Sequence, residues 1–260
     1  MKEDKIWVTW FSKIILDTKC LNCGAPIQEN FCPRCGQKKG VHKVTWKFLF
    51  KEITHFFTHV EKAFIRSTFK MWSNPGHFVK TYLDGQRKDK QSPVSFLVVW
   101  AAVFYLTRET LVHLFDYKME TINTFSFINE EAALYYFKHV TYLTIVFIPV
   151  WAAISWYIGG LFRRINYPEA ILIHFYSYSI FFQLLSLITV LCGLIFRMNI
   201  MSNTINNVYI VAANMNGLWL NYSIQKAYAV KYKIIRSFAI VIIGSFIMIK
   251  FIELITSISK

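Results

Sequence analysis

Four cysteines are the residues of this chain whose type and spacing point most directly to chemistry. They stand in two C-x-x-C-G segments, at residues 20–24 and 32–36, so that the eight residues 24–31 separate the second cysteine from the third. Such a segment places two thiolates on one side of a tight turn, and its glycine lets the backbone bend so that N–H groups point at sulfur. Two of these turns together make a tetrahedral site of four sulfurs. We therefore predict a metal centre with the ligands Cys20, Cys23, Cys32 and Cys35.

Zinc suits this set of ligands best. Iron in a rubredoxin-like site uses the same turns, although usually in a larger domain, and a thioredoxin-like redox role needs one cysteine pair in a βαβ pattern that this sequence lacks. Because all four positions are cysteines, no coordination site stays open for water, and the metal is structural. We predict a zinc ribbon over residues 20–40, since a segment of about 20 residues cannot bury a core of its own.

The composition indicates that a membrane is the solvent for most of the chain. Of the 260 residues, 55% are hydrophobic, 18% aromatic and 17% charged, which is more apolar surface than a water-exposed exterior allows. The 10 Gly, 6 Pro and 5 Cys exclude collagen-like, disordered and disulfide-stapled classes. The net charge is +14, and 17 of the 29 Lys and Arg precede Pro93.

Apolar runs predict an all-α integral membrane domain over residues 93–260. Five runs come near the length of about 20 residues that crosses the hydrocarbon of a bilayer. The fourth is diluted by Asn214, Asn216, Gly217 and Asn221, so whether it crosses fully stays open. The predicted spans are 93–115, 140–162, 170–196, 208–224 and 238–258.

Loop charges give this domain an orientation. Short cytoplasmic loops carry excess Lys and Arg, and the basic loops here alternate along the chain. The segment before Pro93 is basic, the loop at 108–139 has more acidic than basic residues, and the loops at 163–164 and 226–236 are basic again. We therefore expect a protein of the inner (cytoplasmic) membrane with its N-terminus in the cytoplasm and its C-terminus outside. A reducing cytoplasm also suits four unpaired thiols.

Two amphipathic segments flank the cysteines. Residues 1–19 predict a short N-terminal helix, and the basic juxtamembrane region 41–92 contains apolar residues at helical spacing from Trp46 to Trp72, typical of one long amphipathic helix. A cationic face beside an aromatic one favours a place in the membrane interface, although the helix could instead pack on protein. The residues predicted to face anionic lipid are Lys47, Lys51, Lys62 and Arg66.

Ionisable side chains within the predicted spans are functional candidates, because burying them in a membrane is costly. His174 follows Glu169 near the start of the third span. It could take part in an ion relay or form a hydrogen bond to a neighbouring helix, and the hydrogen bond is the favoured interpretation. Lys250 and Glu253 are three residues apart in the last span, so we expect them to neutralise each other.

Several of these motifs occur in an order that resembles a known family. Phe31 and Gln37 flank the second cysteine pair, Asn74-Pro75-Gly76 and Tyr82-x-x-Gly85-x-Arg87 follow, and Ser92-Pro93 leads into an apolar span. Over residues 20 to 107 this resembles an uncharacterised family of bacterial multi-span membrane proteins, mainly from Bacteroidetes, classed as a domain of unknown function. The resemblance implies an N-terminal zinc ribbon, a multi-span membrane domain and no established activity. The later spans are distantly similar to the Yip family of membrane-trafficking proteins.

The leading functional prediction is a non-enzymatic scaffold or adaptor whose zinc ribbon and basic helix engage a protein partner or anionic membrane lipid. The sequence lacks H-E-x-x-H, G-x-S-x-G, a Walker loop and a carboxylate cluster, so an enzyme is not expected. The alternative is a small-solute or ion transporter that uses intramembrane polar residues. Many transporters are built from two equal repeats, and five spans in one chain do not divide in that way. Two copies of the chain in a homo-oligomer would provide two equal halves. Nucleic acid is not an expected partner, since the aromatic excess suits lipid better than phosphate.

Overall fold

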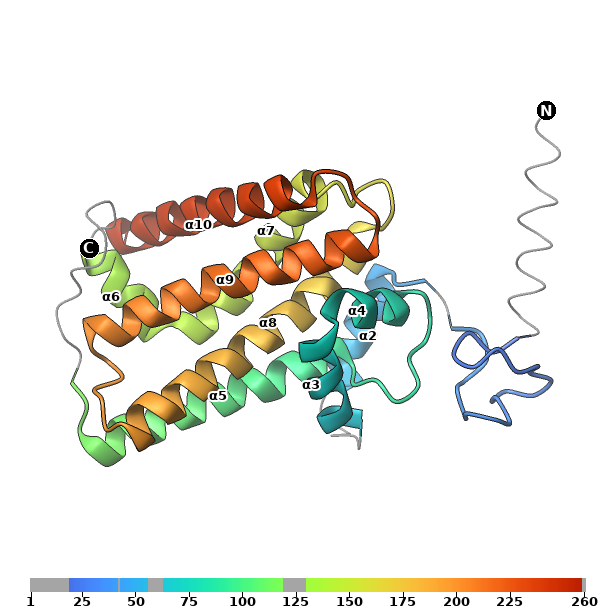
Figure 1. Cartoon of the computed structure of the whole chain (residues 1–260), viewed down its shortest axis with the longest axis horizontal. Helices are drawn as coiled ribbons and strands as arrows, with labels where there is room; N and C mark the ends of the chain where they lie inside the picture. The colour runs from blue at the N-terminus through green and yellow to red at the C-terminus, as the bar shows by residue number, and fades with distance from the viewer. Residues whose placement is uncertain (1–18, 42, 56–62, 119–129, 259–260) are drawn as a thin grey trace.

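The computed structural model describes residues 19–41, 43–55, 63–118 and 130–258, and every regular element within these ranges is a helix. The long helices run side by side between two ends of an elongated bundle (Figure 1). The four cysteines and the short helices α2 to α4 lie at one end, and α6 lies at the other with the end of α10. The predicted helix at 1–19 falls almost entirely outside the described residues.

The helices have the following bounds: α2 Trp46–His55, α3 Ala63–Ser73, α4 Pro75–Leu83, α5 Pro93–Phe115, α6 Glu130–Lys138, α7 Val140–Ile158, α8 Tyr167–Thr189 with a π-helical turn at Val190–Ile195, α9 Asn203–Ala227 and α10 Lys233–Ile258.

Four of these helices are long and apolar enough to cross a membrane: α5, α7, α8 with its π-helical turn, and α10. The shortest has 19 residues, which at the rise of an α-helix is about 28 Å, close to the thickness of the hydrocarbon. Four of the five predicted spans therefore correspond to helices that are long and apolar enough to cross a membrane. The fourth predicted span, 208–224, lies inside α9, which has 25 residues but does not reach the same apolar composition.

Four helices form a closed ring. α8 contacts α7 and α9, and α10 contacts the same two helices from the other side. α5 packs along α8 in the most extensive helix contact of the described chain. There Phe104 stacks on Phe182 with 5.8 Å between ring centroids and meets the edge of Tyr209 at 6.4 Å. The aromatic residues that are so frequent in this sequence thus fill the contact between α5, α8 and α9.

α8 is the most deeply buried of the long helices, and its start is set by local sequence. The side chain of Asn166 accepts a hydrogen bond from the Glu169 backbone N–H at 2.9 Å, and the Glu169 carboxylate accepts one from the Asn166 N–H at 2.8 Å. This reciprocal cap, together with Pro168 in the first turn, satisfies N–H groups that would otherwise lack partners. Val44 O also accepts from the Asn166 amide at 2.9 Å, which ties the segment before α2 to the same point.

α9 has its polar residues inside and its apolar residues outside. Asn206 and Asn216 are buried, whereas Val208, Val211 and Met215 are 40%, 53% and 66% exposed. A helix on the surface of a water-soluble protein shows the opposite arrangement. The average composition of α9 conceals this division, because its inward polar residues offset its outward apolar ones.

The predicted amphipathic helix from Trp46 to Trp72 is represented by two described helices, α2 and α3, and residues 56–62 between them lie outside the described part. Their inner faces pack on the bundle, as the alternative interpretation required. Leu49 is buried, Phe64 stacks on Trp100 at 5.5 Å, and the Trp72 indole N–H donates to the Gln183 side chain at 2.7 Å. Their outer faces carry the exposed apolar residues Phe50, Ile65 and Phe69.

Gly244 sets the distance between α10 and α7. A Cβ atom at this position would collide with the indole ring of Trp151, so Gly244→Leu would force the two helices apart. We expect the free energy of unfolding to fall by about 1–3 kcal/mol, measured by thermal unfolding in mild detergent. Phe246→Leu, at a position of the same helix that is 60% exposed, is the control and should change little. Equal stability of the two variants would show that α7 and α10 do not pack as described.

Candidate metal centre and central cavity

The four cysteine sulfurs form a compact cluster near the start of the described chain. All four lie within 4.8 Å of one another, and the Cys20–Cys35 and Cys23–Cys32 sulfur pairs are 3.5 Å apart. Zinc–sulfur bonds of about 2.3 Å in a tetrahedron place sulfurs about 3.8 Å apart. The cluster therefore has the size that one tetrahedral metal ion requires, and the prediction that these four cysteines meet is confirmed at this level.

Each cysteine pair is carried by a tight turn. Gly24 and Gly36 adopt φ angles of 74° and 71°, and their N–H groups donate to the carbonyls of Cys20 and Cys32 at 2.8 Å. Positive φ is a conformation that glycine adopts without strain. The buried apolar group of this segment consists of Cys20, Cys32 and Ile27. So small a core cannot hold the segment together by burial alone, which is why a metal ion would contribute to its folding.

The thiols affect each other's ionisation. Burial opposes ionisation of Cys32, but the backbone N–H groups of Cys35 and Arg34 and the neighbouring thiols lower its pKa to about 6. At Cys23 a backbone N–H from Ala25 favours the thiolate, but burial and the three other cysteines raise its pKa to about 12. Four thiolates this close together need a cation between them, as four-sulfur metal sites provide.

A single glutamine fastens the cysteine segment to the bundle. Gln37 is buried, its amide nitrogen donates to Gly85 O at 3.0 Å, and its oxygen accepts from the backbone N–H groups of Arg87 and Lys88 at 3.1 Å each. Leu21 lies so close to Gly85 that a Cβ there would come within 2.7 Å of it. The segment is thus attached to the loop that leads into α5. Gln37 belongs to the pattern that resembles a known family, but nothing in its local sequence identifies a partner 48 residues away.

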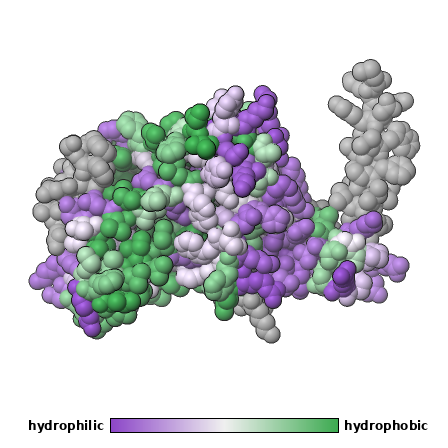
Figure 2. Space-filling model, in the orientation of Figure 1, coloured by the Kyte–Doolittle hydropathy of each residue, from purple (hydrophilic) through white to green (hydrophobic). Residues whose placement is uncertain are grey.

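Charge is distributed unequally between the two ends of the bundle. The end with the cysteines, which we call the module end, comprises residues 19–41, 43–55, 63–92, 159–169 and 226–236 and carries 19 Lys and Arg against 5 Asp and Glu. The opposite end, which we call the far end, comprises 108–118, 130–139, 196–203 and 250–258 and carries 5 of each. Figure 2 shows the hydrophilic surface around the module end and a hydrophobic band on the body.

The residues predicted to face lipid belong to the module end. Lys47 and Lys51 are exposed on α2, and Arg66 is exposed on α3 with a carboxylate oxygen of Asp89 at 3.5 Å. Lys62 lies outside the described residues. The described members of the set therefore share one end of the molecule and point away from its core.

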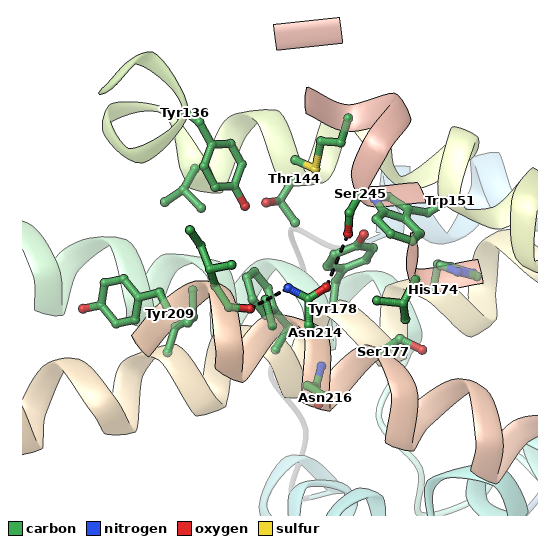
Figure 3. A pocket seen from close by; sticks show the side chains of 18 of the residues that line it. Tyr136, Thr144, Trp151, His174, Ser177, Tyr178, Tyr209, Asn214, Asn216 and Ser245 are labelled. Carbon is green, nitrogen blue, oxygen red and sulfur yellow. Dashed lines mark hydrogen bonds between the residues drawn. The ribbon is translucent and has the colours of Figure 1, made fainter. Parts of the chain in front are cut away.

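A cavity of about 400 Å³ lies within the ring of α7, α8, α9 and α10, and residues of α5 and α6 also line it. Polar side chains from all four helices reach it, as Figure 3 shows for Trp151, Tyr178, Asn214 and Ser245. Ser245 donates to the Asn214 side chain at 3.4 Å, and Asn214 in turn donates to Ile210 O at 2.8 Å. The polar face of α9 thus forms one wall of the cavity.

The structure separates the predicted intramembrane residues into two places. His174 lines the cavity, and its Nδ1 forms a hydrogen bond to Ala170 O at 3.0 Å, within its own helix. No hydrogen bond to another helix is present for it among the described residues. Lys250 and Glu253 pair at 2.8 Å, outside the cavity. Tyr178 and Trp151 also line the cavity. The sequence carries no signal for them, because aromatic residues are frequent on every face of these helices.

The chain was compared with protein-family models, with curated proteins and with solved structures, and no match was found in any of the three. The resemblance to the bacterial membrane family therefore stays a prediction.

The metal centre makes a direct prediction. Purified protein should contain about one zinc ion per chain by plasma mass spectrometry, and the double variant Cys23→Ser and Cys35→Ser should lose it, because the site then lacks two of its four sulfurs. Cys192→Ser, which changes the fifth cysteine far from the cluster, should retain the zinc. Iron in the wild-type protein, or zinc retained by the double variant, would contradict the assignment.

Proposed function

We propose that this protein is a non-enzymatic membrane scaffold with five spans, whose metal-stabilised module end lies at the cytoplasmic surface and binds anionic lipid headgroups. The observation that carries the proposal is the charge difference between the ends, 19 basic and 5 acidic residues at the module end against 5 and 5 at the far end. Cytoplasmic loops of membrane proteins carry such an excess, and anionic lipids of that leaflet attract basic segments.

The arrangement of α9 supports five spans rather than four. Its exposed stripe is apolar, with Val208, Val211 and Met215, and it closes the ring between two helices that are apolar enough to cross. A helix in this position shares the depth of its neighbours, and its asparagines are shielded from lipid by the ring. With five antiparallel crossings the C-terminus comes to the far end, outside the cell.

The surface chemistry of α2 and α3 favours lipid over a protein partner. Phe50 and Phe69 are 64% and 72% exposed, and the exposed cations Lys47 and Arg66 lie on the same two helices. Exposed aromatic groups beside basic ones are typical of surfaces that enter the headgroup region of a membrane. The four-sulfur site has no open coordination position for a substrate, so we assign the metal a structural role.

The lipid proposal is tested with the full-length protein in neutral detergent. Short-chain phosphatidylglycerol should raise the unfolding temperature more than phosphatidylcholine of the same chain length, and salt should weaken the difference. Each surface Lys contributes about 1 kcal/mol to such binding. We therefore expect the triple variant Lys38→Gln, Lys47→Gln and Lys231→Gln to weaken the apparent affinity for phosphatidylglycerol at least about tenfold.

Two control variants accompany this experiment. Replacing the same three lysines by Arg keeps their charge and should keep the affinity for phosphatidylglycerol. The second control, Lys118→Gln with Lys138→Gln, removes charge from the far end, where both side chains are exposed, and should leave that affinity unchanged. If the far-end variant loses as much affinity as the module-end variant, or if both lipids stabilise the protein equally, the module end does not recognise anionic lipid.

The orientation is tested separately in intact cells. In a Cys192→Ser background, a membrane-impermeant maleimide should label Lys118→Cys at the far end and should not label Lys231→Cys at the module end until the cells are opened. Lys118 has a side chain that is 84% exposed, so failure to label it cannot be attributed to burial. The reverse pattern would contradict a cytoplasmic module end.

Small-solute transport is a second candidate function, favoured by one specific observation. The cavity lies within the ring of long helices and is lined by polar side chains of each of them. Transport would require the ring to open alternately at its two ends. It is tested by measuring the uptake of a small solute by vesicles that contain the reconstituted protein.

A further inference from the structure

The central cavity contains hydrogen-bonding groups that are unused within the described chain. The Trp151 indole N–H and the Asn206 amide nitrogen are buried and have no hydrogen-bond partner among the described residues. A buried donor without a partner costs about 1–3 kcal/mol. Two such donors on opposite helices of one cavity therefore indicate that the cavity is completed by something that accepts hydrogen bonds.

Two further groups extend this set. Tyr178 lines the cavity, and its hydroxyl can donate one hydrogen bond. His174 uses Nδ1 for the carbonyl of Ala170, and since a carbonyl can only accept, the proton is on Nδ1 and the neutral ring keeps the lone pair of Nε2. The cavity thus offers donors from Trp151 and Tyr178 and an acceptor from His174, and these three residues lie on α7 and α8.

The charge of the lining excludes ions as the natural occupant. Among the described residues that line the cavity, Arg108 is the only Lys, Arg, Asp or Glu. Its guanidinium is already engaged, with the Glu109 carboxylate at 3.1 Å and Phe137 O at 3.1 Å. A charged ligand would leave water for a site with no free countercharge, which costs far more than transfer of a neutral one.

Much of the remaining lining is apolar, with residues such as Phe104, Phe181, Leu185 and Ile252. Water could satisfy the polar groups, but it would leave these apolar walls wet, which the hydrophobic effect disfavours. The cavity volume of about 400 Å³ falls within the range of sites that hold small organic molecules. An occupant that suits both parts of the lining has a hydrogen-bonding head and an apolar body.

We propose that the ring of α7, α8, α9 and α10 is a binding site for one uncharged amphiphile, whose hydroxyl head accepts from Trp151 and Tyr178 and donates to His174. This inference goes beyond lipid recognition at the module end, and each can hold without the other. It concerns the cavity that favours the transport candidate, but binding does not depend on transport.

The test is photo-crosslinking of the full-length protein in phosphatidylcholine nanodiscs, with farnesol that carries a diazirine in its tail as the probe. Labelled peptides are mapped by mass spectrometry. We expect labelling of inward-facing residues of α8 and α9, such as Tyr178 and Asn214. Unlabelled farnesol should compete, whereas farnesyl phosphate and farnesylamine, which have the same tail and a charged head, should compete at least tenfold less well.

A pair of conservative variants locates the head group. Trp151→Phe with Tyr178→Phe removes one N–H and one O–H but keeps the rings, and should reduce the cavity labelling at least fivefold. The matched control is Trp100→Phe with Tyr142→Phe. Trp100 has a buried indole N–H without a partner in the described chain but does not line the cavity, and Tyr142 is exposed.

Three results would overturn the proposal: labelling confined to the outward stripe of Val208, Val211 and Met215, equal competition by all three head groups, or undiminished labelling of the Trp151 and Tyr178 variant. Both variant pairs must keep the unfolding temperature of the wild type within a few degrees, so loss of labelling is read only from folded protein. Because the nanodiscs contain no anionic lipid, none of these results bears on lipid binding at the module end.

Discussion

Hydrocarbon offers no hydrogen-bond partners, and the arrangement of the long helices follows from that constraint. Polar groups at membrane depth must face other protein groups or an enclosed cavity. α9 carries several polar side chains, and closure of the ring by α8, α9, α10 and α7 places Asn206 and Asn216 inside while Val208, Val211 and Met215 remain outside. Gly244 allows α10 to approach Trp151 closely enough for this closure. The cavity is therefore a consequence of the way in which one polar helix is accommodated among apolar ones.

The cysteine segment follows a different rule, because it lies outside the apolar body and has almost no core. Its four sulfurs gather within 4.8 Å, and Gln37 joins it to the loop before α5 by three hydrogen bonds. A freely tethered metal module would have its position set by a linker. This one is attached to the bundle, so its basic surface adds to that of α2, α3 and the loops at 163–164 and 226–236. The charge difference between the two ends depends on this attachment.

The parts of this structure that sequence could predict are those with a local signature. The C-x-x-C-G spacing identified the four cysteines that meet, and unbroken apolar runs located α5, α7, α8 and α10. Sequence alone leaves open whether α9 crosses the membrane, because hydropathy averages over both faces of a helix, and only its burial pattern shows that Asn206 and Asn216 point inward. The partnership of Gln37 with the loop at 85–88, and the meeting of Trp151, His174 and Tyr178 around one cavity, depend on packing between distant segments, which no local pattern encodes.

The central claim is that α9 crosses the membrane with its polar face turned inward, and Met215, at the middle of its outward stripe and 66% exposed, tests it most directly. A nitroxide spin label at Met215→Cys in reconstituted protein should collide more readily with oxygen, which concentrates in the hydrocarbon, than with a water-soluble nickel chelate. This result would place the middle of α9 within the lipid. A label that collides mainly with the nickel chelate would contradict the account, because α9 would then lie outside the bilayer and the ring would not be a membrane structure.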